Sequence, residues 1–454
     1  MAGRNPARPV QHAPVTQVRW TDVTQLHELA APIAPRAAEG WYPVQAEWSG
    51  SPADHPVEEC LHELFAAQVR RAPDATALVF QGCRVSYAQL NQRANRLAHH
   101  LVQLGIGRGE LVGVYLERGP EPVAAVLAAL KAGAAYTMLA PDASPARIDT
   151  VLAEAGVAVV VTRLGLAAQL RAGGVTTVLL DADAAEIAAR PGSDVVGRGR
   201  PADVACVMFG AGHPGRPAGV VCSHRAVVGT LAGQAYVDFG PGEVFLQCAP
   251  VCWDGFPLEL FGALLFGATC VLPPGRRSRQ VAELVAEHRV SMLHLPAGLL
   301  RVLAEHHPAI FDTVRQVLTR GDPAPVSDLA GLLARHPGLR LVRAYSPVES
   351  MIITADDVVG MADTRHLSVP LGRPVPNQRA YVLDDRLQPV PAGAVGELYT
   401  AGIGLAYGYL NQVGLTAARF VANPFAPGER MYRTGHLVRW RADGEYDFLD
   451  RTGP

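Results

Sequence analysis

A glycine-rich segment, FGAGHPGRPAGVV at residues 209–221, follows an apolar stretch and is the first candidate for chemistry. Glycine allows the backbone of such a turn to approach a phosphate group closely, so that its N–H groups can bind the anion. No GK[ST] follows, so the segment is not a Walker loop, and on spacing alone a structural turn is an equal alternative. A second glycine cluster, GIGLAYG at 402–408, lacks the GxGxxG spacing and favours a structural turn.

Side chains that could act as nucleophiles, bases or metal ligands are sparse. Lys131 is the only lysine among 40 basic residues, so a reaction that needs a lysine has one candidate. Neither GxSxG nor HExxH occurs, which gives no support to a hydrolase elbow or a zinc peptidase. The seven cysteines are scattered and predict buried free thiols in a reducing compartment. Cys248 and Cys252 lack a CxxC pattern or paired histidines, so we expect no zinc there.

Composition excludes several other classes of protein. The chain has 454 residues, of which 49% are hydrophobic and 18% charged, enough for a large core and two to four domains. A net charge of −2 gives no basic excess, so we expect no nucleic-acid partner. The apolar run at 123–130 is too short to span a bilayer, and the N-terminus lacks an apolar signal region. We therefore expect no membrane association and a cytoplasmic location.

The elements that must position these residues follow an alternating pattern. Apolar periodicity predicts helices at 58–71, 87–105 and 121–132, and strands at 77–80, 84–86, 111–116, 158–162, 177–180 and 205–209. Strands that alternate with helices are typical of parallel sheets with covered faces. We expect a linker-like arm at 1–54, α/β subdomains at 55–200 and 201–369, and a β-rich subdomain at 370–451.

Several segments occur in an order that resembles a known family. They include VSYAQLNQRANRLAHHL, LKAGAAY, VCWDGFPLELFGALLFGA, LVRAYSPVESMIIT, LTAARFVANPF and MYRTGHLVRW. The chain resembles, over about residues 57–451, the adenylation domains of non-ribosomal peptide synthetases, in the AMP-forming ligase superfamily. The resemblance implies an adenylate-forming large core of two α/β subdomains and a β-rich subdomain. The family's small C-terminal lid domain is expected to be absent, because the sequence ends near the hinge.

The resemblance also implies an activity, cofactors and partners. Such domains use ATP and Mg²⁺ to convert an amino acid to an aminoacyl adenylate, and then load a carrier protein. Positions that match substrate-contacting residues are Asp254, which would pair with the α-ammonium group, and Gly255, Leu258, His294, Leu318, Arg320, Ala344, Ile352 and Ile353. Positions that match nucleotide-contacting residues are Tyr345 and Arg451. Glu349 matches the family's magnesium-linked glutamate.

The sequence departs from the family at catalytic positions. In the phosphate loop, Gly210, Ala211, His213 and Pro214 stand where the family has triphosphate-binding hydroxyl groups, and Ala218 replaces the loop lysine. The ribose-binding aspartate is His436. Lys131 lies on a helix that the family shares and is expected to be structural. The basic residues His294 and Arg320 could bind an acidic side chain or fill an unused pocket, and we favour filling.

Three functions remain open from the sequence. The first is a catalytically impaired adenylation-domain-like protein with a structural or partner-docking role. The second is an active enzyme completed in trans by another lid domain, and the third is a non-catalytic amino-acid-binding module. The resemblance implies carrier-protein or synthetase partners and docking of a small MbtH-like protein at 415–425. Ala417 and Ala418 would fit between that partner's aromatic side chains, although internal packing of the helix is a slightly better explanation for them.

Overall fold

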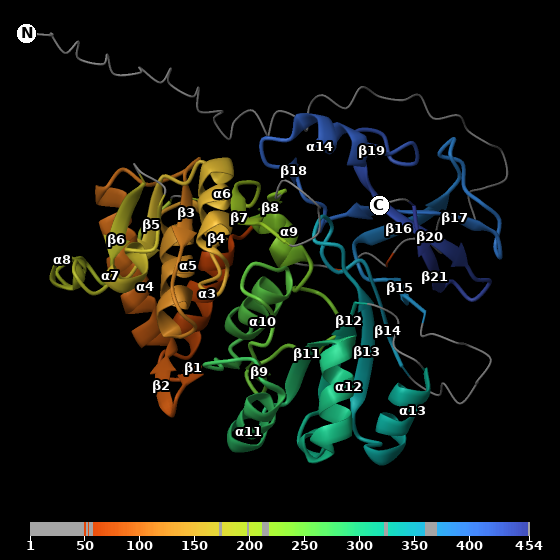
Figure 1. The fold of residues 1–454 in the computed structure, drawn as a ribbon, viewed down its shortest axis with the longest axis horizontal. Coiled ribbons are helices and arrows are strands. Elements are labelled where there is room, and N and C mark those ends of the chain that lie inside the picture. Colours follow the sequence, from red (N-terminus) through yellow and green to blue (C-terminus); the bar gives the residue numbers. More distant parts are fainter. Residues whose placement is uncertain are drawn as a thin grey trace, which may run out of the picture.

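The computed structural model describes residues 50, 53, 58–171, 175–197, 199–210, 218–321, 326–358 and 370–452. Nearly all of the expected N-terminal arm lies outside these residues, as do three loop positions singled out above, Ala211, His213 and Pro214. The expected class is confirmed, because two large sheets with helices and one smaller, β-rich sheet make up the protein (Figure 1).

The first sheet has seven strands and a parallel centre. Its order is β18 (Gly408–Tyr409), β8 (Val220–Ser223), β7 (Val204–Met208), β4 (Ala135–Met138), β3 (Leu111–Val114), β5 (Val159–Thr162) and β6 (Thr176–Leu179). The pairs from β7 to β6 are parallel, whereas β8 and β18 are antiparallel additions. The helices of this part are α3 (Leu61–Arg71), α4 (Tyr87–Gln103), α5 (Pro120–Lys131), α6 (Pro145–Ala155), α7 (Leu164–Ala167), α8 (Ala184–Ala188) and α9 (His224–Gly229).

The second sheet has nine strands. Its order is β15 (Arg373–Pro374), β14 (Thr354–Asp357), β13 (Arg340–Tyr345), β12 (Gln316–Arg320), β11 (Met292–Pro296), β9 (Val244–Leu246), β10 (Thr269–Val271), β1 (Thr76–Phe80) and β2 (Cys83–Ser86). Strands β1 and β9 to β13 run parallel, so the carboxyl ends of β12 and β13 meet at one edge. Its helices are α10 (Gly255–Leu264), α11 (Ser278–His288), α12 (Ala297–His306), the 3-10 helix η1 (Pro308–Asp312) and α13 (Val326–Arg335).

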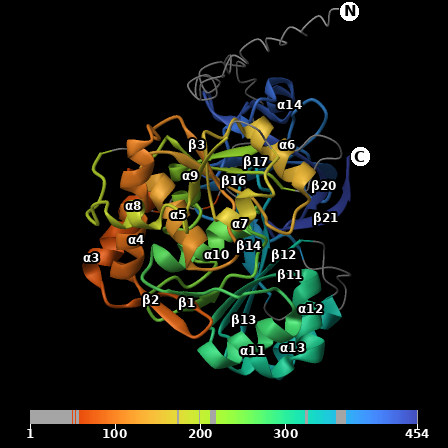
Figure 2. The same cartoon turned by 60° about the vertical axis from the view of Figure 1, so that its left-hand side comes forward.

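The third sheet forms the β-rich part, drawn in blue in Figure 1. Its antiparallel strands are β16 (Gln378–Leu383), β17 (Val395–Gly402), β20 (Arg430–Trp440), β19 (Phe420–Ala422) and β21 (Tyr446–Arg451). Helix α14 (Val413–Arg419) lies beside this sheet and also contacts β18. In both ribbon views α14 lies at the opposite end of the molecule from α11 to α13 (Figures 1 and 2).

The division between sheets does not coincide with the expected boundary at residue 200. The β1–β2 hairpin joins the second sheet, where Leu78 and Val79 align with Cys270 and Val271 of β10. Strands β7 and β8 instead join the first sheet. One apolar core runs through both sheets and includes Leu78, Val112 and Phe261, so the two α/β parts pack as one unit. Local periodicity does not indicate which sheet a strand joins, because that depends on pairing between segments that are distant in the sequence.

Local sequence signals are reproduced well. Ser86 begins α4, and its hydroxyl accepts a hydrogen bond from the Gln89 N–H at 3.2 Å, as expected of a helix N-cap. The turn between the two predicted strands at 77–80 and 84–86 occurs at Gln81 and Gly82, which both have positive φ angles. Five of the seven free cysteines are buried, while Cys83 is exposed. Within the described part of the chain, no helix is both long and apolar enough to cross a membrane.

Candidate functional site

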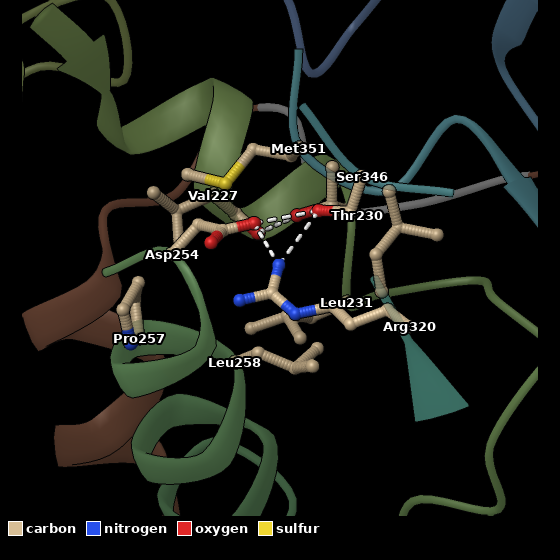
Figure 3. A pocket seen from close by; sticks show the side chains of 10 residues that line it. Val227, Thr230, Leu231, Asp254, Pro257, Leu258, Arg320, Ser346 and Met351 are labelled. Atoms are coloured by element: carbon tan, nitrogen blue, oxygen red, sulfur yellow. Dashed lines mark hydrogen bonds and ion pairs between the residues drawn. The ribbon is translucent and has the colours of Figure 1, made fainter. Parts of the chain in front are cut away.

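Three polar side chains converge where the second sheet meets α10. Asp254 directly precedes α10, Arg320 is the last residue of β12, and Ser346 follows β13. Figure 3 shows the Asp254 carboxylate, the Arg320 guanidinium and the Ser346 hydroxyl pointing toward one another. The edge at the carboxyl ends of parallel strands is where α/β proteins usually bind ligands, so this convergence marks the candidate site.

The three groups form a closed set of charge-assisted contacts. Arg320 Nη1 pairs with Asp254 Oδ2, and the Ser346 hydroxyl donates to the same oxygen at 2.6 Å. Arg320 Nη1 also donates to Ser346 Oγ at 3.1 Å. The side chains of Asp254 and Arg320 are only 4% and 13% exposed. Burial alone would raise the pKa of Asp254, but the Arg320 charge and the two hydrogen bonds outweigh it and hold that pKa below its usual value.

Little space remains beside this ion pair. The cavity has a volume of ≈ 10 Å³, about what one water molecule requires. The residues that line it come from α9, α10, β12 and the segment after β13: Val227, Thr230, Leu231, Asp254, Pro257, Leu258, Arg320, Ser346, Met351 and Ile352. Apart from the polar cluster and Thr230, the lining is apolar. The Arg320 side chain therefore fills the space directly beside the Asp254 carboxylate.

Gly255 makes this packing feasible. A Cβ atom at residue 255 would lie 2.8 Å from His294 Cε1 and 3.1 Å from Arg320 Nη2, closer than normal contact. His294 itself is buried and its Nδ1 lies 3.2 Å from Glu259 Oε1, so its charge partner is a core glutamate. Glu259 also accepts the Ala249 N–H at 2.9 Å. The two basic residues of the expected pocket are thus both paired with internal carboxylates.

The remaining substrate-side positions divide into two groups. Asp254, Leu258, Arg320 and Ile352 line the cavity. Leu318 and Ala344 are buried in the main core, and Ile353 belongs to the core of the β-rich part. Ser346 and Thr230 also line the cavity, although no binding role was predicted for them. The family that the chain resembles has a glycine at the position of Ser346, and this difference could have indicated a role for the serine.

His436 lies among the residues that the resemblance assigns to nucleotide binding. The Tyr345 hydroxyl and His436 Nδ1 are hydrogen-bonded at 2.8 Å, and the His436 ring packs edge-on against Phe448 at 5.4 Å. Burial, reinforced by Arg451 and Arg419, lowers the pKa of His436 to about 4. The ring is therefore neutral near pH 7, and it cannot supply the two charge-assisted acceptors that a carboxylate offers to a ribose. Arg451 lies opposite His436 in the β20–β21 pairing.

Glu349 keeps a carboxylate at the position that the resemblance links to magnesium. The Tyr409 hydroxyl donates to Glu349 Oε1 at 2.7 Å and lies 3.2 Å from the Tyr432 hydroxyl. A carboxylate is a suitable Mg²⁺ ligand, so this position fits the metal. The His436 position does not fit a ribose, and Ala218, which packs on the main core, offers no charge to a phosphate. The described residues therefore fit a tightly held nucleotide poorly.

The only lysine has a structural environment. Lys131 is 2% exposed, and its Nζ lies 2.7 Å from Asp194 Oδ1. Burial lowers the pKa of Lys131, and the Asp194 carboxylate opposes that effect. The amine thus holds the end of α5 against the segment before β7.

Helix α14 presents a different kind of surface. Ala417 and Ala418 are exposed, and the nearby Val413 is 63% exposed. The opposite side of the helix is anchored, because buried Thr416 accepts a hydrogen bond from the Tyr409 N–H at 2.9 Å. Ala417 and Ala418 are therefore not needed to pack the helix onto the body.

Fold and site together define an α/β protein with a buried polar cluster at the carboxyl edge of a parallel sheet. Residues 65–410 match the AMP-binding enzyme family, and the chain belongs to that family. A linear gramicidin synthase of Brevibacillus parabrevis is 37% identical over 437 residues, 94% of this chain but 6% of that synthase. Tyrocidine synthase 3 of the same organism is 35% identical over 90% of this chain and 6% of its own length.

Solved structures give the same picture. The nonribosomal peptide synthetase FmoA3 bound to α-methyl-L-serine-AMP superposes with a TM-score of 0.84 at 33% identity, covering 93% of this chain and 48% of that one. A PA1221 structure, described as an NRPS protein with adenylation and PCP domains, has a TM-score of 0.79 at 27% identity over 88% of this chain and 69% of that one. The resemblance to peptide-synthetase adenylation domains is confirmed, and the chain spans only a small part of its curated relatives.

Proposed function

We propose that this chain is a catalytically impaired adenylation-domain-like part of a peptide-biosynthesis system, with a structural or partner-docking role. The observation that carries the proposal is the buried contact of Arg320 and Ser346 with Asp254. The family resemblance assigns Asp254 to the ammonium group of an amino acid substrate. Here an internal guanidinium supplies that positive charge, and a substrate would have to displace it.

Displacing Arg320 is costly for two physical reasons. Its guanidinium is buried, and a buried charge that loses its partner costs several kcal/mol. The cavity beside it holds about one water molecule, so an amino acid side chain also has no room while Arg320 stays in place. The same reasoning disfavours the third alternative, a module that binds a free amino acid through Asp254.

The nucleotide side supports the same proposal. The FmoA3 structure with AMPPNP, which is 33% identical to this chain and has a TM-score of 0.82, was solved with a nucleotide analogue bound. In this chain Ala218 and His436 replace the loop lysine and the ribose-binding aspartate of the resemblance. A charge-assisted contact contributes about 1.5–3 kcal/mol and a neutral hydrogen bond about 0.5–1.5 kcal/mol. Their combined loss predicts a dissociation constant for ATP of about 1 mM or weaker.

One set of residues favours the alternative of an active enzyme completed in trans. Asp254, Glu349, Tyr345 and Arg451 keep the residue types of the resemblance. In that alternative the chain would bind ATP and Mg²⁺ when another protein supplies a lid domain, and Glu349 would hold the metal. Arg320 would then have to leave Asp254 when the amino acid arrives.

We propose that the partners are other synthetase domains, including a carrier protein, and a small MbtH-like protein on α14. PA1221 carries adenylation and PCP domains in one chain, which is consistent with a carrier partner. The exposed Ala417, Ala418 and Val413 form a small apolar surface to which flat aromatic side chains could pack closely. A cytoplasmic location, where carrier-bound synthesis takes place, is part of this proposal.

ATP–pyrophosphate exchange with a panel of amino acids tests the proposal. The assay is run on this chain with and without a lid domain from a related synthetase. We expect no amino-acid-dependent exchange in either case. Exchange that depends on the added lid domain would support the enzyme completed in trans, and exchange without it would overturn the proposed impairment.

A further inference from the structure

A cluster of three metal-ligating side chains lies outside the pocket described above. Cys60, at the N-terminus of α3, and His62, within its first turn, approach His224 at the N-terminus of α9. One donor atom from each of the three residues lies within 4.8 Å of the other two. Cys60 is 0% exposed, His62 7% and His224 2%, so the donors face one another away from solvent.

The imidazoles of this cluster are in a state suited to a metal ion. His62 Nδ1 is buried and has no hydrogen-bond partner among the described residues, which is unusual for a buried ring nitrogen. An imidazole nitrogen without a hydrogen-bond partner can donate its lone pair to a metal ion when the ring is neutral. A competing internal bond is long: Leu61 N–H donates to His224 Nδ1 at 3.3 Å.

The surrounding chain encloses the cluster tightly. A Cβ atom at residue 199 would lie 2.9 Å from His62 Cε1 and 3.3 Å from Cys60 Sγ, so a glycine there lets the backbone close over the donors. The same segment is fixed to α9, because the His224 N–H donates to the Asp203 carbonyl at 3.1 Å. The cluster thus joins α3, α9 and the segment before β7, three parts that are distant in sequence.

We propose that Cys60, His62 and His224 form a binding site for one zinc ion. A set of one thiolate and two imidazole ligands binds Zn²⁺ in preference to Mg²⁺ or Ca²⁺. Bond lengths of about 2.0–2.3 Å place tetrahedral ligands roughly 3.5 Å apart, so small side-chain rotations complete the site. Zinc binds the thiolate form of Cys60, so the thiol proton is released to solvent when the metal binds. The fourth position takes water or another small ligand.

The location gives the zinc ion a structural role. His224 begins α9, while Val227 of the same helix and Thr230 directly after it line the Asp254 cavity. A metal that links α3 to the start of α9 would fix the helix that forms one wall of the cavity. This role does not depend on adenylation activity, so its test is independent of the function proposed above.

Zinc titration of the demetallated full chain against a chromogenic chelator tests the site. We expect one equivalent to bind with sub-micromolar affinity, and Cys60→Ser to weaken binding about 100-fold or more. Serine is a good N-cap, so this variant should still fold. Cys83→Ser, which alters an exposed thiol, is the matched control and should bind zinc as the parent does.

Cobalt substitution provides a second readout. The parent and Cys83→Ser should show thiolate-to-cobalt charge-transfer absorption, and Cys60→Ser should not. If Cys60→Ser loses its native circular dichroism, His224→Gln is used, and it should lower zinc affinity by a similar factor while keeping a cobalt–thiolate band. No zinc bound at one equivalent, or unchanged affinity in both variants, would overturn the site.

Discussion

The Asp254 cavity and the outer face of α14 differ in whether their side chains have partners within the protein. The polar side chains of the cavity are paired with one another, whereas the alanines of α14 are exposed. In the cavity, Asp254, Arg320 and Ser346 satisfy one another and leave room for about one water molecule. On α14, Ala417 and Ala418 are exposed to solvent, and they are not needed to pack the helix onto the rest of the protein. A site whose charges are balanced internally has no physical need of a ligand, whereas exposed small apolar side chains are available to a partner.

Under the function proposed above, docking and catalysis would be lost or kept separately in this fold. The two regions lie on different elements, since the cavity involves α9, α10 and β12 while the surface is on α14. Arg320 fills space in the cavity, and α14 contributes none of the residues that line it. The comparison therefore favours a role in partner docking over one in catalysis. Substitutions in the cavity and on α14 test the two parts of this comparison separately.

The largest expected effect is on stability, from removing the cavity's carboxylate. Asp254→Ala leaves Arg320 buried without its partner and should lower the free energy of unfolding by about 3–5 kcal/mol. Urea denaturation measures the loss. The double variant Asp254→Leu with Arg320→Met, which removes both charges, should be close to the parent in stability. A loss below about 1 kcal/mol for Asp254→Ala would mean that the carboxylate is not engaged internally.

The next effect concerns the surface of α14. Ala418→Glu places a charge and a longer side chain where a partner would pack, and it should weaken association with an MbtH-like protein by at least about 2 kcal/mol, or roughly 30-fold. Co-purification followed by calorimetry measures this change. Ala185→Glu, the same change at an exposed position on α8, should have no effect. Equal binding by Ala418→Glu and the parent would remove the docking surface from the comparison.

A smaller effect is a pH dependence from the nucleotide side. The pKa of His436 is lowered to about 4 in the folded protein by burial, with Arg451 and Arg419 nearby and Glu397 opposing them. The unfolded ring takes up a proton near pH 6.5, so the contribution of His436 to stability is present above pH 6.5 and is lost as pH falls toward 4. Since the ring is partly exposed, we expect a loss of about 1–2 kcal/mol.

His436→Asn isolates this contribution from those of other buried histidines. Thermal unfolding of the parent and the variant is compared at several pH values between 7 and about 4. The difference in stability between them should change in favour of the variant as pH falls. A constant difference would show that His436 is not held neutral, and that the nucleotide side is less closed than the cavity.

Much of the fold could be predicted, because it is indicated by local sequence patterns and by the order of the motifs along the chain. The order of the motifs indicated the family, and Ser86 with its following amphipathic run indicated α4. The contacts that decide function were not accessible in this way. Arg320 and Asp254 lie 66 residues apart, and no periodic pattern indicates that their side chains meet.

The proposed zinc site shows the same limit. Cys60 and His62 flank the start of one helix, and His224 belongs to another, so the sequence held no CxxC-like spacing that could indicate their meeting. The expected pocket also included Leu318, Ala344 and Ile353, which pack in cores instead. The matching positions predict where a site lies but not which side chains fill the space there, because that depends on large side chains such as Arg320.

The central claim is that this core has lost tight nucleotide binding along with its open pocket. Calorimetric titration with Mg-ATP tests it most directly, because it measures nucleotide binding to this chain without requiring turnover. The account predicts a dissociation constant of about 1 mM or weaker for the parent. It also predicts at least about tenfold tighter binding for Ala218→Lys combined with His436→Asp, which restores two charged contacts. A micromolar dissociation constant for the parent chain would contradict the account.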